Sequence, residues 1–158
     1  MDLLPVEVYT AASVRAMDRG AIEQAGIPGY TLMQRAGEAA FNALRRHWPA
    51  ARIIAVLCGP GNNGGDGYVV ARLARAAGLD VRVIAPAGAR DLRGDAARAH
   101  ADFTAAGGRT LALDADAFDG CDLAVDALLG TGIDRPLDDP YSGTIREVNR
   151  LQIGRAHV

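Results

Sequence analysis

A glycine-rich segment joins an apolar run to a helical pattern. It reads Gly59-Pro-Gly-Asn-Asn-Gly-Gly-Asp-Gly67 and follows the apolar run at 52–58. Glycines let a backbone come close to a ligand, and the start of a helix offers free N–H donors to an anion. The plainer alternative is a turn that holds many glycines. Because five glycines, two asparagines and one aspartate within this segment exceed what a turn needs, we predict a phosphate- or ribose-binding loop, called the first cradle below.

The first cradle also fits the dinucleotide fingerprint GxGxxG through Gly59, Gly61 and Gly64. Alone, this fingerprint is a weak signal. Dehydrogenases that use it carry an acidic residue at the end of the second strand, where it holds a ribose. The second strand predicted here ends at Ala85 and is followed by Pro86. The missing acid disfavours a hydride-transferring dehydrogenase but leaves phosphate or ribose binding open.

A second glycine-containing segment, Gly130-Thr-Gly-Ile-Asp-Arg-Pro136, follows another apolar run. We call it the second cradle. The Thr131 hydroxyl suits phosphate contacts, and Arg135 can supply positive charge or instead form a surface ion pair with Asp138 or Asp139. Loops that leave the carboxyl ends of parallel strands open at one edge of the sheet. We therefore expect the two cradles to form one site.

Asp126 interrupts the apolar run before the second cradle. A carboxylate in such a strand is costly unless a cation or several donors hold it. It can be a structural group that accepts loop N–H bonds, a ligand of a hard cation, or a group that transfers a proton. Aspartate and asparagine oxygens suit a hard cation better than zinc.

Apolar spacing predicts the elements that position these groups. Two helices are expected before the first strand, one capped by Thr10 and ending at Gly26, the other capped by Thr31 and ending at Trp48. Strands are expected at 52–58, 81–85, 110–113 and 122–128, and further helices ending at Gly78, running from Asp91 or Asp95 to about 106, and covering 141–151. No clear pattern covers 152–158. Strands that alternate with helices predict an α/β fold whose parallel sheet has helices on both faces.

Composition narrows the class of protein. The chain has 158 residues, a net charge of −2, 49% hydrophobic residues, and 17 basic residues that are all arginine. One domain with a hydrophobic core is expected. The small net charge argues against nucleic-acid binding, and the lack of lysine excludes Walker and Schiff-base lysines. No apolar run approaches the ~20 residues of a membrane span and the start carries no signal-peptide pattern, so we expect a cytoplasmic protein.

The cysteines and histidines show no metal-binding pattern. Cys58 and Cys121 lie far apart, each in or beside an apolar run, and we expect two reduced, buried thiols. His47, His100 and His157 share no ligand spacing with one another or with the cysteines. A zinc site is therefore not expected.

The segment Cys58–Gly67, together with Val125-Asp-Ala-Leu-Leu-Gly-Thr-Gly132, resembles the YjeF N-terminal domain family of NAD(P)H-hydrate epimerases. Met17-Asp18 and Leu32-Met-Gln-Arg-Ala-Gly37 are similar too, so the resemblance covers nearly all of residues 1–158. It implies a Rossmann-like three-layer αβα sandwich with two leading helices. It also implies an isomerase that interconverts the R and S forms of NADHX or NADPHX, hydrates with a hydroxyl at C6 of the nicotinamide ring. A separate or fused ADP/ATP-dependent dehydratase, which accepts only the S form, is the implied partner.

The resemblance also implies a set of site residues and a potassium ion. The substrate contacts fall on Asn62, Asn63, Gly64, Gly65 and Asp66 in the first cradle. In the second cradle they fall on Gly130, Thr131, Gly132, Ile133, Asp134, Arg135 and Pro136. The potassium ligands fall on Asn63 and Asp126.

Epimerisation at C6 requires loss and re-addition of the hydroxyl group, and the leaving oxygen needs a proton. We expect Asp126 to be the catalytic acid/base, directly or through a water molecule. Asp66 is the alternative, because a bound potassium ion favours the ionised form of Asp126. The amides of the cradles and Arg135 would hold the pyrophosphate and so fix the ring.

The family continues with a Val-Asp-x-Pro-Ser-Gly motif, which would begin just beyond Val158. Residues 150–158 do not resemble the approach to that motif. We therefore expect the domain to be truncated at its C-terminal end or to end in non-native residues, and to turn over poorly. A non-catalytic nucleotide- or partner-binding module of the same fold is the alternative. The preference between NADHX and NADPHX, and a homodimer, are left open.

Overall fold

The computed structural model describes residues 9–114, 116–131, 133 and 136–158. Five parallel strands form one sheet in the order β3-β2-β1-β4-β5. The strands are β1 (Ile53–Cys58), β2 (Asp80–Ile84), β3 (Thr110–Leu111), β4 (Leu123–Ala127) and β5 (Gly154–His157). The helices are α1 (Ala11–Glu23), α2 (Gly29–His47), α3 (Asn62–Ala76), α4 (Gly94–Ala105) and α5 (Tyr141–Arg150).

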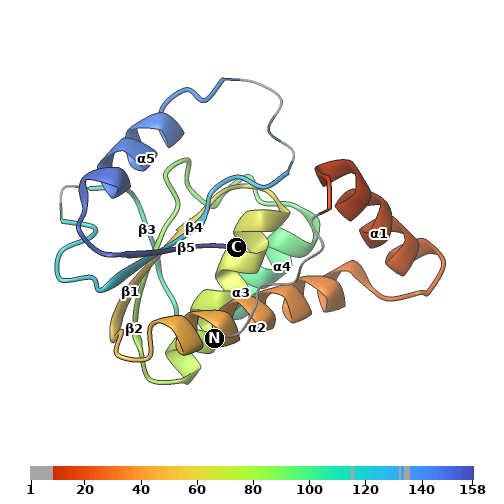
Figure 1. Ribbon diagram of the computed structural model, residues 1–158, viewed down its shortest axis with the longest axis horizontal. Helices are drawn as coiled ribbons and strands as arrows, with labels where there is room; N and C mark the ends of the chain where they lie inside the picture. Colours follow the sequence, from red (N-terminus) through yellow and green to blue (C-terminus); the bar gives the residue numbers. More distant parts are fainter. Residues whose placement is uncertain (1–8, 115, 132, 134–135) are drawn as a thin grey trace.

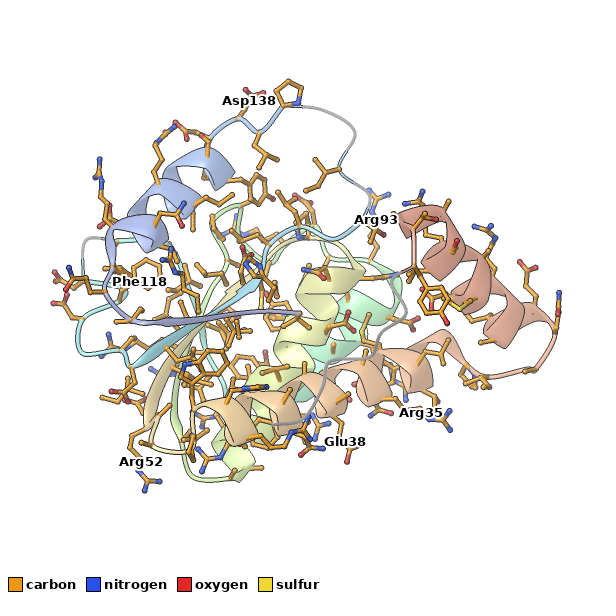
Figure 2. All side chains as sticks on the ribbon, in the orientation of Figure 1. Arg35, Glu38, Arg52, Arg93, Phe118 and Asp138 are labelled. Carbon is orange, nitrogen blue, oxygen red and sulfur yellow. The ribbon has the colours of Figure 1, made fainter. Side chains whose placement is uncertain are left out.

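Helices cover both faces of the sheet, as Figure 1 shows. Ile54 and Val56 of β1 point to the face where α2, α3 and α4 pack, and Ala55 and Leu57 point to the face of α5. In Figure 2, Phe118 lies on the α5 side. Because both faces are covered, β1 is a continuous apolar run rather than an alternating one. The predicted three-layer αβα sandwich is confirmed.

The strand order reverses between β1 and β4. The chain passes from β1 through α3 to β2 and through α4 to β3, and then returns to place β4 on the other side of β1. Leu57 is in register with Asp126 and Cys58 with Ala127, so β1 and β4 end at the same level. Ligands of open parallel sheets bind at such a reversal point, beyond the carboxyl ends of the strands.

The starts of α2 and α4 differ from the sequence prediction, whereas the start of α1 agrees with it. Thr10 does cap α1, since its hydroxyl accepts a hydrogen bond from the Ser13 N–H at 3.1 Å. Thr31 does not cap α2, which begins at Gly29 behind Pro28. The Pro28 carbonyl accepts the N–H bonds of Thr31 at 2.9 Å and Leu32 at 3.2 Å, which starts the helix without a side-chain cap.

Helix α4 begins at Gly94 with Arg93 at its N-cap, so neither Asp91 nor Asp95 opens it, and Asp95 lies in its first turn. Strand β5 was not predicted at all. It is a four-residue edge strand whose residues alternate between half-buried and exposed, and it therefore lacks the apolar run by which the other strands are recognised.

The two leading helices have different roles. Helix α2 packs on α3 and the sheet, and Figure 2 shows Arg35 and Glu38 on its outer side. Helix α1 stands beside the sandwich in Figure 1, and none of its residues is buried. Its Met17 and Ile22 side chains are 49% and 44% exposed. No helix in the part of the chain that the structure describes has the length and apolarity to cross a bilayer.

Both cysteines are buried and free, which confirms the prediction. Burial raises the pKa of the Cys58 thiol and is the largest cause of the raised pKa of the Cys121 thiol. Both side chains are therefore protonated hydrophobic groups of the core rather than nucleophiles.

Candidate active site

The first cradle becomes helical earlier than predicted. Only Gly59, Pro60 and Gly61 form a loop, because α3 begins at Asn62. The segment 62–67 therefore forms the first turns of α3. Glycine has a low helix propensity, so a run rich in glycine predicts a loop. Close packing against the sheet overrides that propensity here.

Several glycines of the first cradle are required by packing alone. A Cβ atom on Gly59 would lie 1.7 Å from the Leu128 carbonyl oxygen, and one on Gly64 would lie 1.9 Å from the Gly59 carbonyl oxygen. A Cβ on Gly67 would lie 2.6 Å from the Cβ of Ala127. These glycines let α3 lie directly against the ends of β1 and β4. Gly61 has open space around it and is the glycine that leaves room for a ligand.

The start of α3 offers backbone donors at this edge of the sheet. The Gly65 N–H donates to the Gly61 carbonyl at 3.1 Å, which opens the ladder of helical hydrogen bonds. Gly61 stands at the N-cap and provides no side-chain cap. The N–H groups of Asn62, Asn63 and Gly64 precede that ladder. They form the positive end of the helix dipole, a ready anion-binding arrangement.

The second cradle starts beside the first. The Gly59 N–H donates to the Ala127 carbonyl at 3.0 Å. A Cβ on Gly130 would lie 3.2 Å from the Cβ of Asn63 and 3.4 Å from its Oδ1. These contacts confirm that the cradles open side by side at one edge of the sheet.

Thr131 is tied to α1, because its carbonyl accepts a hydrogen bond from Arg15 Nη1 at 2.7 Å. Ile133 is 51% exposed and Pro136 is exposed. The predicted contacts of Gly132, Asp134 and Arg135 lie outside the described residues, as does the alternative ion pair of Arg135. Asp139, one of the two aspartates considered as partners of Arg135, forms an ion pair with Arg146 at 3.4 Å.

Asp126 is more open to solvent than its place in an apolar strand indicates. Its side chain is 30% exposed, and Oδ2 lies 3.4 Å from Nδ1 of His157 on β5. Oδ1 accepts a hydrogen bond from the Leu128 N–H at 3.0 Å. Asp126 borders a cavity of about 160 Å³ on the α5 face, together with Leu57 and Asn149. A loop N–H thus satisfies one of its oxygens, as the structural interpretation of this residue expected.

Asp66 lies on the other side of the site, in the second turn of α3. It borders a further cavity of about 160 Å³, whose lining includes Asp18 and Ile22 of α1, Met33 of α2, and Asp95 of α4. Burial, and secondarily the charge of Asp18, raise the pKa of Asp66 to about 7. A carboxyl group with this pKa can both donate and accept a proton near neutral pH.

Sequence reasoning did not select Arg15, Asp18 or Asp95. Arg15 and Asp18 are three residues apart, a spacing that puts both on one side of a helix. That spacing alone does not show which element the helix faces. Arg15 and Asp18 are near the site because α1 lies beside Thr131 and Asp66.

Oxygen donors suitable for a hard cation are present among the residues that the structure describes. The described residues contain no group of three or more His, Cys, Asp or Glu side chains placed to hold a metal ion. The Asn63 amide oxygen lies beside Gly130, and the Asp126 carboxylate lies on the adjoining strand β4. An amide oxygen and a carboxylate are ligands that a hard cation accepts.

The chain belongs to the YjeF N-terminal family. Residues 29–156 match the family described as "YjeF-related protein N-terminus". Over 97% of this chain, the fold is that of the crystal structure of yeast YNL200c, with a TM-score of 0.86 and 24% sequence identity. The likeness covers 70% of the yeast chain.

Relatives named for NAD(P)H-hydrate repair or epimerisation are similar to this chain over most of its length. It is 44% identical over 92% of its length to the bifunctional NAD(P)H-hydrate repair enzyme Nnr of Escherichia coli, of which it spans 28%. It is 39% identical over 90% of its length to the NAD(P)H-hydrate epimerase of Limosilactobacillus fermentum, spanning 68% of that protein. It is 41% identical over 94% of its length to the NAD(P)H-hydrate epimerase of Bordetella pertussis, spanning 62% of it.

Proposed function

We propose that this chain is an NAD(P)H-hydrate epimerase, an isomerase that interconverts the R and S forms of NADHX or NADPHX. The observation that carries the proposal is the position of the two cradles at the reversal between β1 and β4, where a Cβ on Gly130 would lie 3.2 Å from the Cβ of Asn63. Relatives named for this activity match about nine-tenths of the chain, at 39% identity for the Limosilactobacillus fermentum protein.

The cradles are proposed to hold the nucleotide part of the substrate. The free N–H groups at the start of α3 suit the pyrophosphate, and the neighbouring second cradle extends the same surface. Fixing the nucleotide in this way would hold the nicotinamide ring at a defined place, so that proton transfer occurs within one complex. The predicted contacts on 62–66 and 130–136 are retained as part of this proposal.

Asp66 is the better candidate for the acid/base. Its pKa of about 7 gives it a proton to donate at neutral pH. Asp126 instead accepts a hydrogen bond from the Leu128 N–H, and its carboxylate oxygens are ligands that a hard cation accepts. We therefore assign proton transfer to Asp66 and give Asp126 to the cation.

The proposed reaction balances without a redox partner. Protonated Asp66 gives its proton to the C6 hydroxyl group, the C6–O bond breaks, and water leaves with the bonding electrons. The lone pair of the ring nitrogen forms a C=N bond to C6, and the ring carries the positive charge. Water then adds to the opposite face of C6, and its surplus proton returns to the Asp66 carboxylate.

A potassium ion is proposed at Asn63 and Asp126, because their amide and carboxylate oxygens are ligands of the type that a hard cation accepts. Bound there, it would supply positive charge between the two cradles and offset the Asp126 carboxylate. We also propose a dehydratase as the consumer of the S epimer, since the Escherichia coli relative is named as a bifunctional repair enzyme. That enzyme would be either a separate protein or a fused domain.

Binding of hydrated and unhydrated nucleotides tests the proposal. Isothermal titration calorimetry should show tighter binding of NADHX than of NADH to the chain, and Asp66→Asn should keep NADHX binding within a few fold. Asparagine has nearly the same size as aspartate, so the variant removes the proton rather than the shape. Equal affinity for NADH and NADHX, or a preference for NADH, would contradict the assignment.

A further inference from the structure

Helix α1 reaches the site although it is not part of the core. None of its residues is buried, yet Arg15 Nη1 donates to the Thr131 carbonyl of the second cradle at 2.7 Å. Asp18 and Ile22 line the cavity that also contains Asp66 and Asn62. Arg15, Asp18 and Ile22 follow the i, i+3, i+7 spacing of one helix face. The face of α1 that they form is therefore directed at both cradles.

The guanidinium of Arg15 places positive charge at the second cradle. All 17 basic residues of the chain are arginine, so fixed cationic charge at the site must come from arginine. Among the residues described by the structure, the ion pairs within 4.0 Å do not include Arg15. The hydrogen bond to Thr131 uses one of five guanidinium N–H donors. The remaining donors, on an exposed side chain, are available to an anion.

The same edge of the sheet carries the uncapped start of α3, whose free N–H groups also favour an anion. Gly130, the neighbour of Thr131, lies close to Asn63 in the first turn of α3, since a Cβ on Gly130 would lie 3.2 Å from the Cβ of Asn63. The guanidinium and the helix N-terminus are thus linked through two consecutive residues of the second cradle. A diphosphate carries charge on two adjacent phosphoryl groups and can engage both donors.

We propose that Arg15 is a binding residue for the diphosphate of a nicotinamide dinucleotide, and that the Arg15–Asp18–Ile22 face of α1 is a wall of the site. The identity of the ligand rests on the proposed function. In this arrangement Arg15 binds the diphosphate beside Thr131 and leaves the reacting ring to Asp66. Arginine suits this role because its planar fork contacts two oxygens at once.

The test measures diphosphate binding separately from epimerisation. ADP-ribose, which contains the diphosphate but no nicotinamide ring, is titrated into the wild-type chain and into Arg15→Ala, Arg15→Lys and Arg19→Ala. Arg19 lies one turn along the same helix and is exposed, so Arg19→Ala is the control for loss of one positive charge. Arg15→Ala should weaken binding about tenfold or more, as expected for a lost charged hydrogen bond.

Arg15→Lys should give an intermediate affinity because it keeps the charge but loses the fork. The affinity of the wild type should fall more steeply with added salt than that of Arg15→Ala, an effect that a merely structural role would not produce. In the epimerase assay, Arg15→Ala should raise KM and leave kcat within a few fold. An Arg15→Ala affinity equal to that of Arg19→Ala would overturn the proposal. If Arg15→Ala loses ADP-ribose binding but the wild type does not epimerise NADHX, the proposed function is refuted and the binding role of Arg15 is not.

Discussion

The two carboxylates at the site, Asp66 and Asp126, have different surroundings. The roles proposed for them follow from this difference. Asp66 shares a cavity with Asp18, and burial, followed by the charge of Asp18, favours its protonated form. Asp126 receives a backbone N–H and has an imidazole neighbour. The ionisation of Asp66 should therefore make the free energy of unfolding depend on pH.

The first prediction concerns Asp66→Asn. The native pKa of about 7 lies above the ~4 of an unfolded aspartate. The native state therefore binds more protons between these values, and the free energy of unfolding falls as pH rises through that window. Urea unfolding should show the variant to be more stable than the wild type at pH 8 and nearly equal to it at pH 4. If the free energies of unfolding of the two proteins changed with pH in parallel, the pKa of Asp66 would be that of an ordinary aspartate.

Asp122 provides a second prediction, of opposite sign and away from the site. It accepts the N–H bonds of Arg52 at 2.7 Å and Ile53 at 2.9 Å, and these bonds lower its pKa. Its contribution to stability is present above the unfolded value of ~4 and is lost as pH falls through the lower native value. Asp122→Asn should therefore lower the midpoint of urea unfolding at pH 7 and match the wild type near pH 2. A variant that is as stable as the wild type at pH 7 would remove this role.

At the scale of elements, the site depends on the close approach of α3 to β1 and β4. Gly59 and Gly64 contact backbone oxygen atoms that cannot move aside as a side chain can. Gly37 in α2 has a similar function, because a Cβ there would lie 2.5 Å from Cγ1 of Val69 in α3. The glycines thus determine where the start of α3 lies relative to the second cradle.

The third prediction compares two glycines in the same segment. Gly64→Ala places a Cβ against a carbonyl oxygen and should cost about 3 kcal/mol of stability or prevent folding, the upper end for overpacking. Gly61→Ala meets open space and should cost no more than about 1 kcal/mol, the loss expected for alanine at an N-cap. Thermal unfolding of both variants gives the comparison. Similar losses at the two positions would mean that α3 does not pack as described.

The sequence patterns predicted the parts of the fold that are buried on both faces. The continuous apolar runs of β1 and β4 and the glycine segments after them were sufficient to predict two adjacent cradles. The start of α3 at Asn62 was not predictable, because glycine disfavours helix unless packing compensates. Strand β5 has no apolar run, and the place of Arg15 depends on how α1 docks, which is a tertiary contact.

At the scale of the whole molecule, the proposed cation and the proposed nucleotide would each link the two cradles. A ligand that binds only the folded chain stabilises it in proportion to the logarithm of its concentration. Potassium at Asn63 and Asp126 would connect the start of α3 to β4. Substrate at both cradles would connect the same elements and α1.

The fourth prediction tests the cation. Potassium chloride should raise the Tm of the wild-type chain by more than lithium chloride at equal ionic strength, and Asn63→Ala or Asp126→Ala should each remove the difference. Asp139→Ala is the control, because Asp139 is also a partly solvated carboxylate and lies in the surface ion pair with Arg146. Identical responses to both salts in the wild type would speak against a specific potassium site.

The most direct measurement of the central claim is the time course of a single pure epimer. (R)-NADHX is incubated with the chain, and the R and S forms are separated by chromatography at intervals. We predict that the S form accumulates faster than without protein, that Asp66→Asn reduces this rate at least about 100-fold, as for loss of a general acid, and that Asp126→Asn retains more activity than Asp66→Asn. Conversion no faster than the protein-free reaction, or full activity in Asp66→Asn, would contradict the account.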